Sequence, residues 1–233
     1  MTALVQNHGN TVALVQKMRT KIIKIDPARP EVAYSQCREV VSSGGVIAYP
    51  TDTFYGLGVD PENPVAVKRL FEIKGRQKDR PILVLIADPA DAGRWAAEIT
   101  AVAAELMSRY WPGPLTLVFS AKAGVLPELT AGTGTIGLRV PGSVLARDLI
   151  GFIGRALTGT SANLSGRPSP RTARETAEEL GDVVDIVLDG GETTGGTAST
   201  VIDVTAGMPR VIREGAVPGR DILARYKNLW KER

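Results

Sequence analysis

Four polar stretches in this sequence could do chemistry, and the first two present a carboxylate and a cluster of cations. Thr51-Asp52-Thr53 forms a turn directly after the apolar run Val46–Tyr49. The stretch "KGRQKDRP" gathers four cations within seven residues: Lys74, Arg76, Lys78 and Arg80. Such a cluster at the entrance of a strand suits a polyphosphate, because arginine offers a forked donor and lysine a point charge. A solvated turn and a solvated basic loop are the alternatives.

The other two stretches are rich in hydroxyl groups. "GTSAN" (159–163) imitates the turn that exposes a nucleophilic serine in some hydrolases, but Asn163 stands where that turn has glycine. The one histidine, His8, lies near the N-terminus, so Ser161 has no obvious base. We therefore interpret Ser161 and Asn163 as hydrogen-bonding groups for phosphate or metal-bound oxygens. "GETTGGTAST" (191–200) is a flexible loop, or one that closes over a ligand.

Several other kinds of site are excluded. The single cysteine, Cys37, cannot form an internal disulfide, and one cysteine with one histidine excludes the usual zinc ligand sets. No Walker-type phosphate loop is present. "GTGTIG" (132–137) has the spacing of the dinucleotide fingerprint, but a strand-like run follows it where a helix should begin. Chemistry must therefore rely on Lys, Arg, Asp, Glu, Ser, Thr, Asn and backbone groups, with Mg²⁺ as a metal that a substrate could bring.

The composition is that of an ordinary globular protein. The 233 residues are 43% hydrophobic and 23% charged, and 25 glycines and 15 prolines predict many turns between short elements. The net charge of +3 fits either a mildly basic surface or a basic cavity or nucleic-acid face. No apolar run approaches the roughly 20 residues that span a bilayer, and the N-terminus does not read as a secretory signal. We expect a cytoplasmic protein with no membrane partner.

Short strands and helices alternate along the chain. Amphipathic helices are predicted over Glu31–Ser43, Pro64–Lys74 and Ile99–Tyr110, and Thr172 with Glu175 forms a capping box before a fourth. Runs rich in Val, Ile and Leu predict strands at Val46–Tyr49, Ile82–Ala87, Leu115–Ser120, Thr135–Val140, Ala156–Thr158, Asp185–Leu188, Thr200–Val204 and Arg210–Arg213.

This alternation predicts one α/β domain built on a twisted mixed sheet with flanking helices. We place the domain at residues 21–220. Residues 1–20 are expected to be a loose N-terminal extension, and residues 221–233 a basic C-terminal helix or tail.

Seven stretches together resemble one family, the YrdC/TsaC-like threonylcarbamoyl-AMP synthases. In chain order they are "GGVIAYPTDTFYGLG", "LFEIKGRQKDRPILVLI", "YWPGPLTLVF", "TIGLRVP", "TSANLSGRPSP", "GGTASTVIDVT" and "VIREGAV". They run from about Gly44 to Val217. Each stretch alone is a weak signal, and the seven in this order are specific.

The resemblance implies an α/β fold around a large basic cavity. It implies an enzyme that makes threonylcarbamoyl-AMP from L-threonine, bicarbonate (or CO₂) and ATP, and releases pyrophosphate. The product serves threonylcarbamoyl-adenosine formation in tRNA, so tRNA or the tRNA-modification machinery is a possible partner. Some family members carry a further C-terminal domain, and this chain resembles the short, single-domain form.

The resemblance also implies roles for individual residues. The family signature that YciO-type relatives lack corresponds to Lys74, Arg76, Ser161 and Asn163, which are the expected catalytic residues. The expected L-threonine contacts are Thr53, Arg139 and Ser199. The expected ATP contacts are Arg76, Arg80, Thr135, Ser161, Asn163 and Arg213. Mg²⁺ would arrive with ATP, with no protein side chain fixing it.

Two departures from the family pattern affect these roles. Leu85 stands where some relatives have a histidine, so a threonine contact there is not expected. Arg80 stands where some relatives have asparagine or lysine.

Asp52 is either the acceptor of the threonine amine proton or the cap of its own turn, and both interpretations stay open.

Two other functions compete with the synthase. The chain could be an RNA-binding module with a basic concave surface, although aromatic residues for base stacking are only 5% of the sequence. It could also be a related enzyme that makes a carbamoyl adenylate from another amine.

Overall fold

Two mixed β-sheets form the framework of the protein in the computed structural model, which describes residues 20–75 and 80–227. One sheet has the order β1 (Lys21–Lys24), β9 (Ile186–Asp189), β2 (Ile47–Pro50), β3 (Tyr55–Gly58), β8 (Thr160–Ser161). The other has the order β11 (Arg210–Arg213), β10 (Thr200–Asp203), β5 (Leu115–Ser120), β6 (Thr135–Arg139), β4 (Val84–Leu85), β7 (Leu157–Thr158). Each sheet contains parallel and antiparallel pairs.

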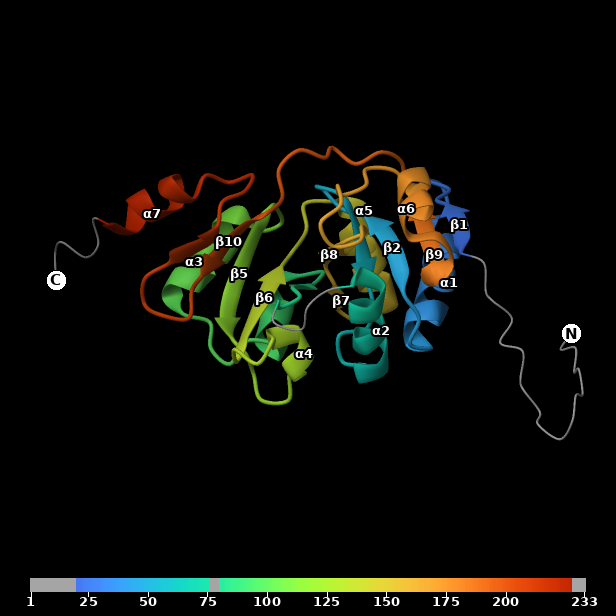
Figure 1. Cartoon of the computed structure of the whole chain (residues 1–233). Helices are drawn as coiled ribbons and strands as arrows, with labels where there is room; N and C mark the ends of the chain where they lie inside the picture. The colour runs from blue at the N-terminus through green and yellow to red at the C-terminus, as the bar shows by residue number, and fades with distance from the viewer. Residues whose placement is uncertain (1–19, 76–79, 228–233) are drawn as a thin grey trace, which may run out of the picture.

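Helices flank both sheets, as Figure 1 shows. They are α1 (Pro30–Ser42), α2 (Pro64–Lys74), α3 (Ala101–Tyr110), α4 (Pro127–Thr130), α5 (Val144–Ile153), α6 (Ala173–Leu180), α7 (Gly219–Lys227) and the short 3₁₀ turns η1 (Pro89–Arg94) and η2 (Gly181–Val183). The predicted α/β class with helices around mixed sheets is confirmed, with two sheets in place of the single one expected.

Local sequence signals set the ends of the helices. The Asn63 side chain accepts hydrogen bonds from two backbone N–H groups at the start of α2, and Gly75 ends that helix in the left-handed region with φ +54°. The capping box before α6 is also present, because Thr172 accepts from the Glu175 N–H. The Glu175 carboxylate accepts from the Arg171 N–H and so reaches one residue further back than the usual capping box.

Both predicted terminal segments lie partly outside the described residues. The predicted N-terminal extension lies outside them except for Thr20, so its state is not described. The predicted C-terminal helix over 221–233 corresponds in part to α7, and residues 228–233 lie outside the described part.

The hydrophobic core consists of two clusters of buried side chains. The larger includes Leu57, Leu117 and Leu138 from both sheets. The smaller lies where α1 and α5 pack on the sheet that contains β2, and it includes Cys37. Burial raises the pKa of the Cys37 thiol to about 12, so this cysteine is a core residue with little thiolate at neutral pH.

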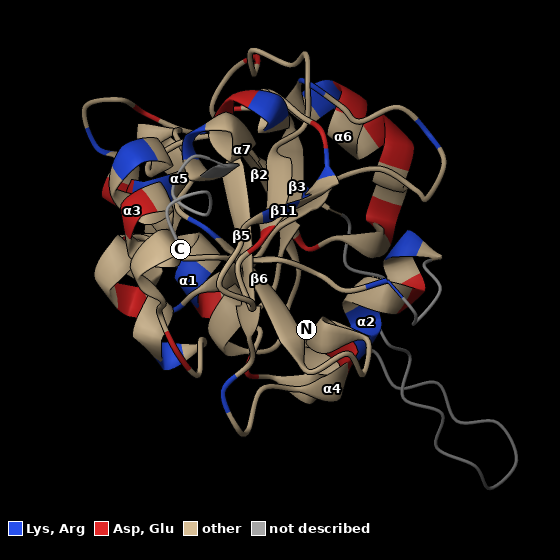
Figure 2. Ribbon diagram, turned by 90° about the vertical axis from the view of Figure 1, so that its left-hand side faces the viewer, with Lys and Arg blue, Asp and Glu red and all other residues tan. Residues whose placement is uncertain are grey.

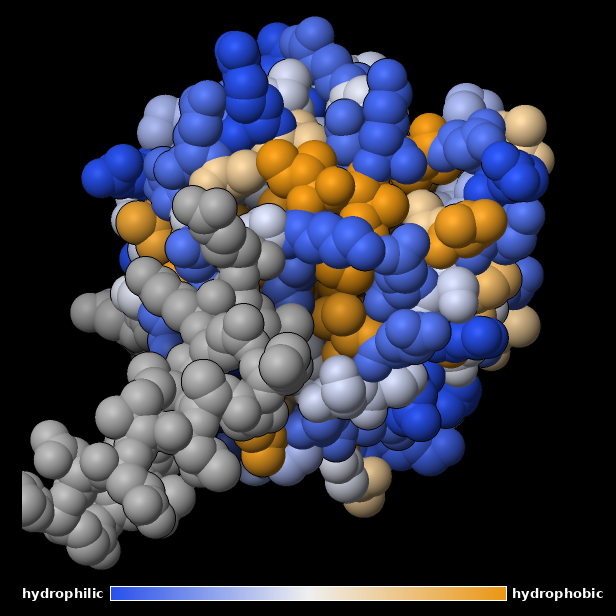
Figure 3. Space-filling model, turned by 90° about the vertical axis from the view of Figure 1, so that its right-hand side faces the viewer, coloured by the Kyte–Doolittle hydropathy of each residue, from blue (hydrophilic) through white to orange (hydrophobic). Residues whose placement is uncertain are grey.

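The outer surface carries charges of both signs, which Figure 2 shows mixed over the helices. On the face in Figure 3, hydrophobic residues gather between hydrophilic ones. Ile22 of β1 and Val32 of α1 are more than half exposed, at 52% and 57%. Within the described residues, no helix combines the length and the apolar character needed to cross a membrane.

Candidate active site

A cavity of about 660 Å³ lies against one face of the β11-to-β7 sheet. Strand β6 contributes Thr135, Gly137 and Arg139 to its lining, while Ile136 and Leu138 are fully buried in the core. This alternation follows from the two-residue period of a strand. At roughly 3.3 Å per residue, Thr135 and Arg139 lie about 13 Å apart along the strand.

The neighbouring strands complete the walls. Thr116 and Val118 of β5 line the cavity, and so do Ser199 and Val201 at β10. The other sheet contributes residues of β3 and β8: Tyr55, Gly56, Thr160 and Ser161. Residues from both sheets thus line the cavity.

Three arginines and no carboxylate are among the described residues that line this cavity. Arg80, Arg139 and Arg213 supply the positive charge, and the threonines and serines supply hydroxyl groups. Guanidinium and hydroxyl donors, with no carboxylate in the described lining itself, favour an anionic ligand.

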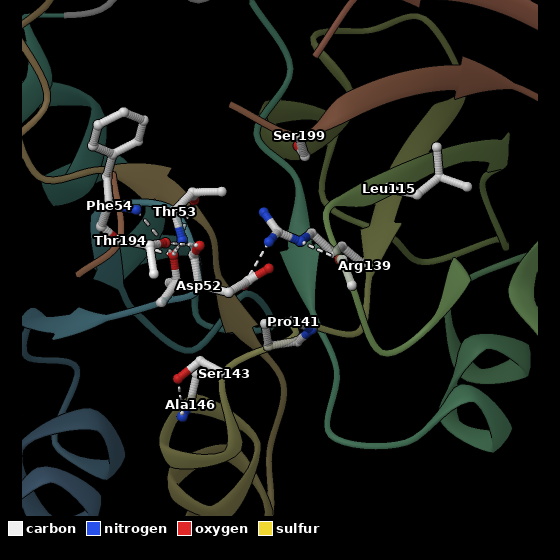
Figure 4. Close-up of polar contacts among 12 residues, drawn as sticks. Asp52, Thr53, Phe54, Leu115, Arg139, Pro141, Ser143, Ala146, Thr194 and Ser199 are labelled. Atoms are coloured by element: carbon white, nitrogen blue, oxygen red, sulfur yellow. Dashed lines mark hydrogen bonds and ion pairs between the residues drawn. The ribbon is translucent and has the colours of Figure 1, made fainter. Parts of the chain in front are cut away.

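Arg139, Thr53 and Ser199, the three predicted threonine contacts, lie together at one end (Figure 4). Thr53 Oγ1 is 3.1 Å from Thr51 Oγ1 within the turn. Ser199 Oγ is 2.9 Å from Thr116 Oγ1 on the adjacent strand. Arg139 donates from Nε to the Gly113 carbonyl at 2.9 Å.

Asp52 forms a close ion pair with Arg139. Its Oδ1 accepts from Arg139 Nη2 at 2.5 Å, and the two side chains are only 19% and 6% exposed. Asp52 is not among the lining residues of the cavity. The Asp52 carboxylate therefore contacts the Arg139 guanidinium from outside the cavity lining.

Arg213 lies close to the same end. It donates from Nη2 to the Ser199 carbonyl at 2.7 Å and to Ser199 Oγ at 3.2 Å. Burial, and to a smaller degree the charge of Arg139, lower the pKa of Arg213. Two guanidinium groups thus act on one region of the cavity, where an anion would relieve their repulsion.

Lys74 is placed behind the cavity. Its ammonium is buried and donates to the backbone carbonyls of Ser161 at 2.6 Å and Asn163 at 2.5 Å, and to Asn163 Oδ1 at 3.1 Å. Neither Lys74 nor Asn163 is among the lining residues, whereas Ser161 is. The Asn163 amide donates to the carbonyls of Leu164 and Arg167. Lys74 and Asn163 therefore hold the segment that presents Ser161.

The remaining predicted ATP contacts are partly described. Arg80 and Thr135 line the cavity, and Thr135 Oγ1 is 2.8 Å from Thr133 Oγ1. Arg76 lies outside the described residues. Leu85, the position of the first departure from the family pattern, is buried and lines the cavity.

Sequence reasoning missed several lining residues, and two of them, Thr116 and Thr133, carry hydroxyl groups. Thr116 alternates with the core residues Leu115 and Leu117 in a predicted strand, which marked it as facing away from the core. The sequence carried no comparable signal for Thr133. Among the described residues, no group of three or more His, Cys, Asp or Glu side chains is placed to hold a metal ion.

Comparison with known proteins decides the family. The Sua5/yciO/yrdC family model, described as "Telomere recombination", matches residues 39–215. The chain belongs to the Sua5/YciO/YrdC family.

Sua5/YciO/YrdC relatives resemble the chain over most of its length. A threonylcarbamoyl-AMP synthase of Pyrococcus abyssi is 42% identical over 78% of this chain and 54% of the relative. One from Bacillus subtilis is 38% identical over 84% of this chain and 56% of the relative, so the chain spans about half the length of these two. One from Idiomarina loihiensis is 38% identical over 74% of this chain and 92% of the relative.

Solved structures of the family show the same fold. P. abyssi Sua5 complexed with L-threonine superimposes with a TM-score of 0.83 at 37% identity, over 88% of this chain and 61% of that one. Escherichia coli YciO superimposes with a TM-score of 0.79 at 30% identity, over 88% of this chain and 99% of that one. Both branches of the family therefore share this architecture.

Proposed function

We propose that the chain is a threonylcarbamoyl-AMP synthase, which makes threonylcarbamoyl-AMP and pyrophosphate from L-threonine, bicarbonate (or CO₂) and ATP for threonylcarbamoyl-adenosine formation in tRNA. The observation that carries the proposal is the arrangement along β6. Arg139 at one end of the cavity suits a carboxylate, and hydroxyl groups about 13 Å away at Thr135 suit another part of a long ligand. The printed names of the relatives support the same activity.

L-Threonine would occupy the end formed by Thr53, Arg139 and Ser199. Its carboxylate would pair with the Arg139 guanidinium, which is buried and therefore acts in a medium of low dielectric. The Thr53 and Ser199 hydroxyls lie near this guanidinium (Figure 4). The bound threonine of P. abyssi Sua5 supports an amino-acid site in this fold.

ATP would occupy the rest of the cavity. Arg80, Thr135 and Ser161 line it and would contact the nucleotide, and Arg76 would add a second cation next to Lys74 in the sequence. Lys74 and Asn163 contribute by fixing the Ser161 segment. The proposed role of Lys74 is thus positioning, in place of the catalytic role expected from the resemblance.

The reaction needs no protein nucleophile. The threonine amine and bicarbonate form a carbamate with loss of water, and a carbamate oxygen then attacks the α-phosphorus of ATP. The bond between the α-phosphorus and the bridging oxygen breaks, and pyrophosphate leaves with the electron pair. Arg213 lies next to the amino-acid end and would stabilise charge on the α-phosphate.

The donor set of the cavity fits a metal carried by the substrate. Its described lining offers hydroxyls and backbone but no carboxylate. Mg²⁺ prefers oxygen ligands and keeps several waters, so triphosphate oxygens would hold it and it would neutralise phosphate charge. The residues of this chain would then bind and orient the reactants.

Pyrophosphate release from ATP and bicarbonate, with each amino acid supplied in turn, tests this function. Release that depends on threonine is the expected result. Release with another amine alone would indicate a different carbamoyl adenylate. RNA binding that weakens steeply with salt, without any pyrophosphate release, would replace the proposal with a binding module.

A further inference from the structure

The guanidinium of Arg139 is held on two of its edges. Nε donates to the Gly113 carbonyl, and Nη2 donates to Asp52 Oδ1. Among the described residues, Nη1 has no hydrogen-bond acceptor, although the residue is only 5% exposed and lines the cavity. A buried donor without a partner is costly, so Nη1, beside the second N–H of Nη2, is left for a ligand.

Asp52 is itself fixed in place. The turn that contains it is closed by Thr51 Oγ1, which donates to the Phe54 carbonyl at 2.8 Å. Thr194, from the loop after β9, donates to the Asp52 carbonyl at 2.8 Å (Figure 4). Gly142 packs so closely that an added Cβ would lie 2.9 Å from Asp52 Oδ2. The carboxylate is therefore enclosed beside Arg139.

This enclosure separates two roles for Asp52. A proton acceptor for the substrate amine must reach the ligand, but Asp52 does not line the cavity and its Oδ1 is already engaged by Arg139. A carboxylate that compensates and aims a buried guanidinium needs the placement that is observed.

We propose that Asp52 is a positioning residue that aims the free Nη1 edge of Arg139 at the carboxylate of the amino-acid substrate. The inference rests on the proposed function. Asp52 does not touch substrate: it fixes the orientation of Arg139, and the backbone at Gly142 keeps the carboxylate in place.

Steady-state kinetics of two substitutions at Asp52 test the inference. Asp52→Ala removes the acceptor, and we expect the KM for threonine to rise about ten- to a hundredfold with a small change in kcat, because a charge-assisted hydrogen bond is lost. Asp52→Asn keeps an oxygen that can accept from Nη2, so its KM should lie between those of the wild type and Asp52→Ala. The KM for ATP should stay unchanged in both.

A control and a second variant separate this role from general destabilisation. Asp60 is a buried carboxylate that accepts from Arg155 at 3.0 Å and does not line the cavity. Asp60→Asn should lower stability without raising the KM for threonine. Gly142→Ala places a methyl group against the Asp52 carboxylate and should raise that KM without changing any polar group.

Three results would overturn the inference. The first is an unchanged KM for threonine in both Asp52→Ala and Gly142→Ala. The second is an equal loss of kcat in Asp52→Ala and Asp52→Asn with KM retained, which would make Asp52 the proton acceptor. The third is a wild-type chain that releases no pyrophosphate with any amino acid, in which case the proposed function fails as well.

Discussion

The Lys74 ammonium lies 2.5 Å from the backbone carbonyl oxygen of Asn163 and 3.1 Å from the oxygen of the Asn163 side-chain amide. A third oxygen, the Ser161 carbonyl, is 2.6 Å away. Two residues that the sequence places 89 positions apart thus form one polar cluster at the end of α2. The cluster connects the start of the basic stretch "KGRQKDRP" to the segment that contains Ser161 and Asn163. It explains how these two parts of the sequence come to lie at one cavity.

Lys74→Met should destabilise the fold as well as lower activity. The substitution keeps an apolar stem but removes the Lys74 donor from two buried oxygens and one half-buried oxygen, so we expect the free energy of unfolding to fall by about 2–3 kcal/mol. Pyrophosphate release should fall at least about tenfold because Ser161 loses its support. Urea unfolding and turnover, measured on the same preparation, check both effects.

Lys68, an exposed lysine on the same helix, supplies the control. Lys68→Met should change neither quantity appreciably, because an exposed side chain contributes little. Lys74→Met with wild-type stability and reduced turnover would instead favour a direct contact between Lys74 and phosphate.

Arg139→Lys should raise the KM for threonine by about tenfold or more, and leave the KM for ATP nearly unchanged. Lysine keeps the positive charge but cannot donate to Gly113, Asp52 and a ligand in the fixed fork of a guanidinium. Threonine titration by calorimetry checks the affinity directly. Arg155→Lys, at an ion pair outside the cavity, is the matched control. A rise in the KM for ATP alone would contradict the assignment of this end to the amino acid.

The regular elements were predictable where periodicity was strong. Leu115–Ser120 and Arg210–Arg213 have the predicted bounds, and so does the helix Pro64–Lys74. β3 was missed because two of its four residues are glycines, and β8 because it has only two residues. β8 pairs with β3, which lies far earlier in the chain, and β3 itself bridges β8 and the strand that precedes it, β2.

The candidate site was predictable in its residues and less so in its geometry. The resemblance to a family named Thr53, Arg139 and Ser199, and the structure brings them together. Nothing in the sequence indicates that Lys74 points into the protein, because the acceptors described for it come from a segment far along the chain. The Asp52–Arg139 ion pair could not be predicted for the same reason. Its two residues are far apart in the sequence, and both their burial and their distance in space depend on the tertiary fold.

Stability should depend on pH through Asp203, which faces Arg210 across β10 and β11. Burial raises the pKa of Asp203, but hydrogen bonds from Thr205 and Arg210 outweigh it and the pKa lies below its ordinary value. The carboxylate therefore stabilises the fold above its unfolded pKa of about 3.9, and this contribution is lost as pH falls through the lower folded pKa.

Asp203→Asn measures that contribution. Arg210 is well exposed, so we expect at most about 1 kcal/mol of destabilisation near neutral pH. The difference from the wild type should shrink as the pH falls below about 3.9. Urea unfolding across this range checks the trend, with the exposed Glu98→Gln as control. A difference that grows with acidity would contradict the direction of the pKa shift.

Gly137→Val should block the reaction while preserving the fold. Gly137 lies midway between Thr135 and Arg139 on the cavity face of β6, and an added Cβ would already lie 3.4 Å from side-chain atoms of Leu83 and Thr116. The branched methyl groups of valine would project into the space between the two ends, so joint binding of nucleotide and amino acid should be lost. We expect kcat/KM to fall on the order of a hundredfold, as for misplaced reactants, with no loss of thermal stability because valine favours strands. Gly137→Ala, which adds only the Cβ, should retain most activity. A Gly137→Val enzyme with wild-type turnover would mean that the two substrates do not meet along this strand.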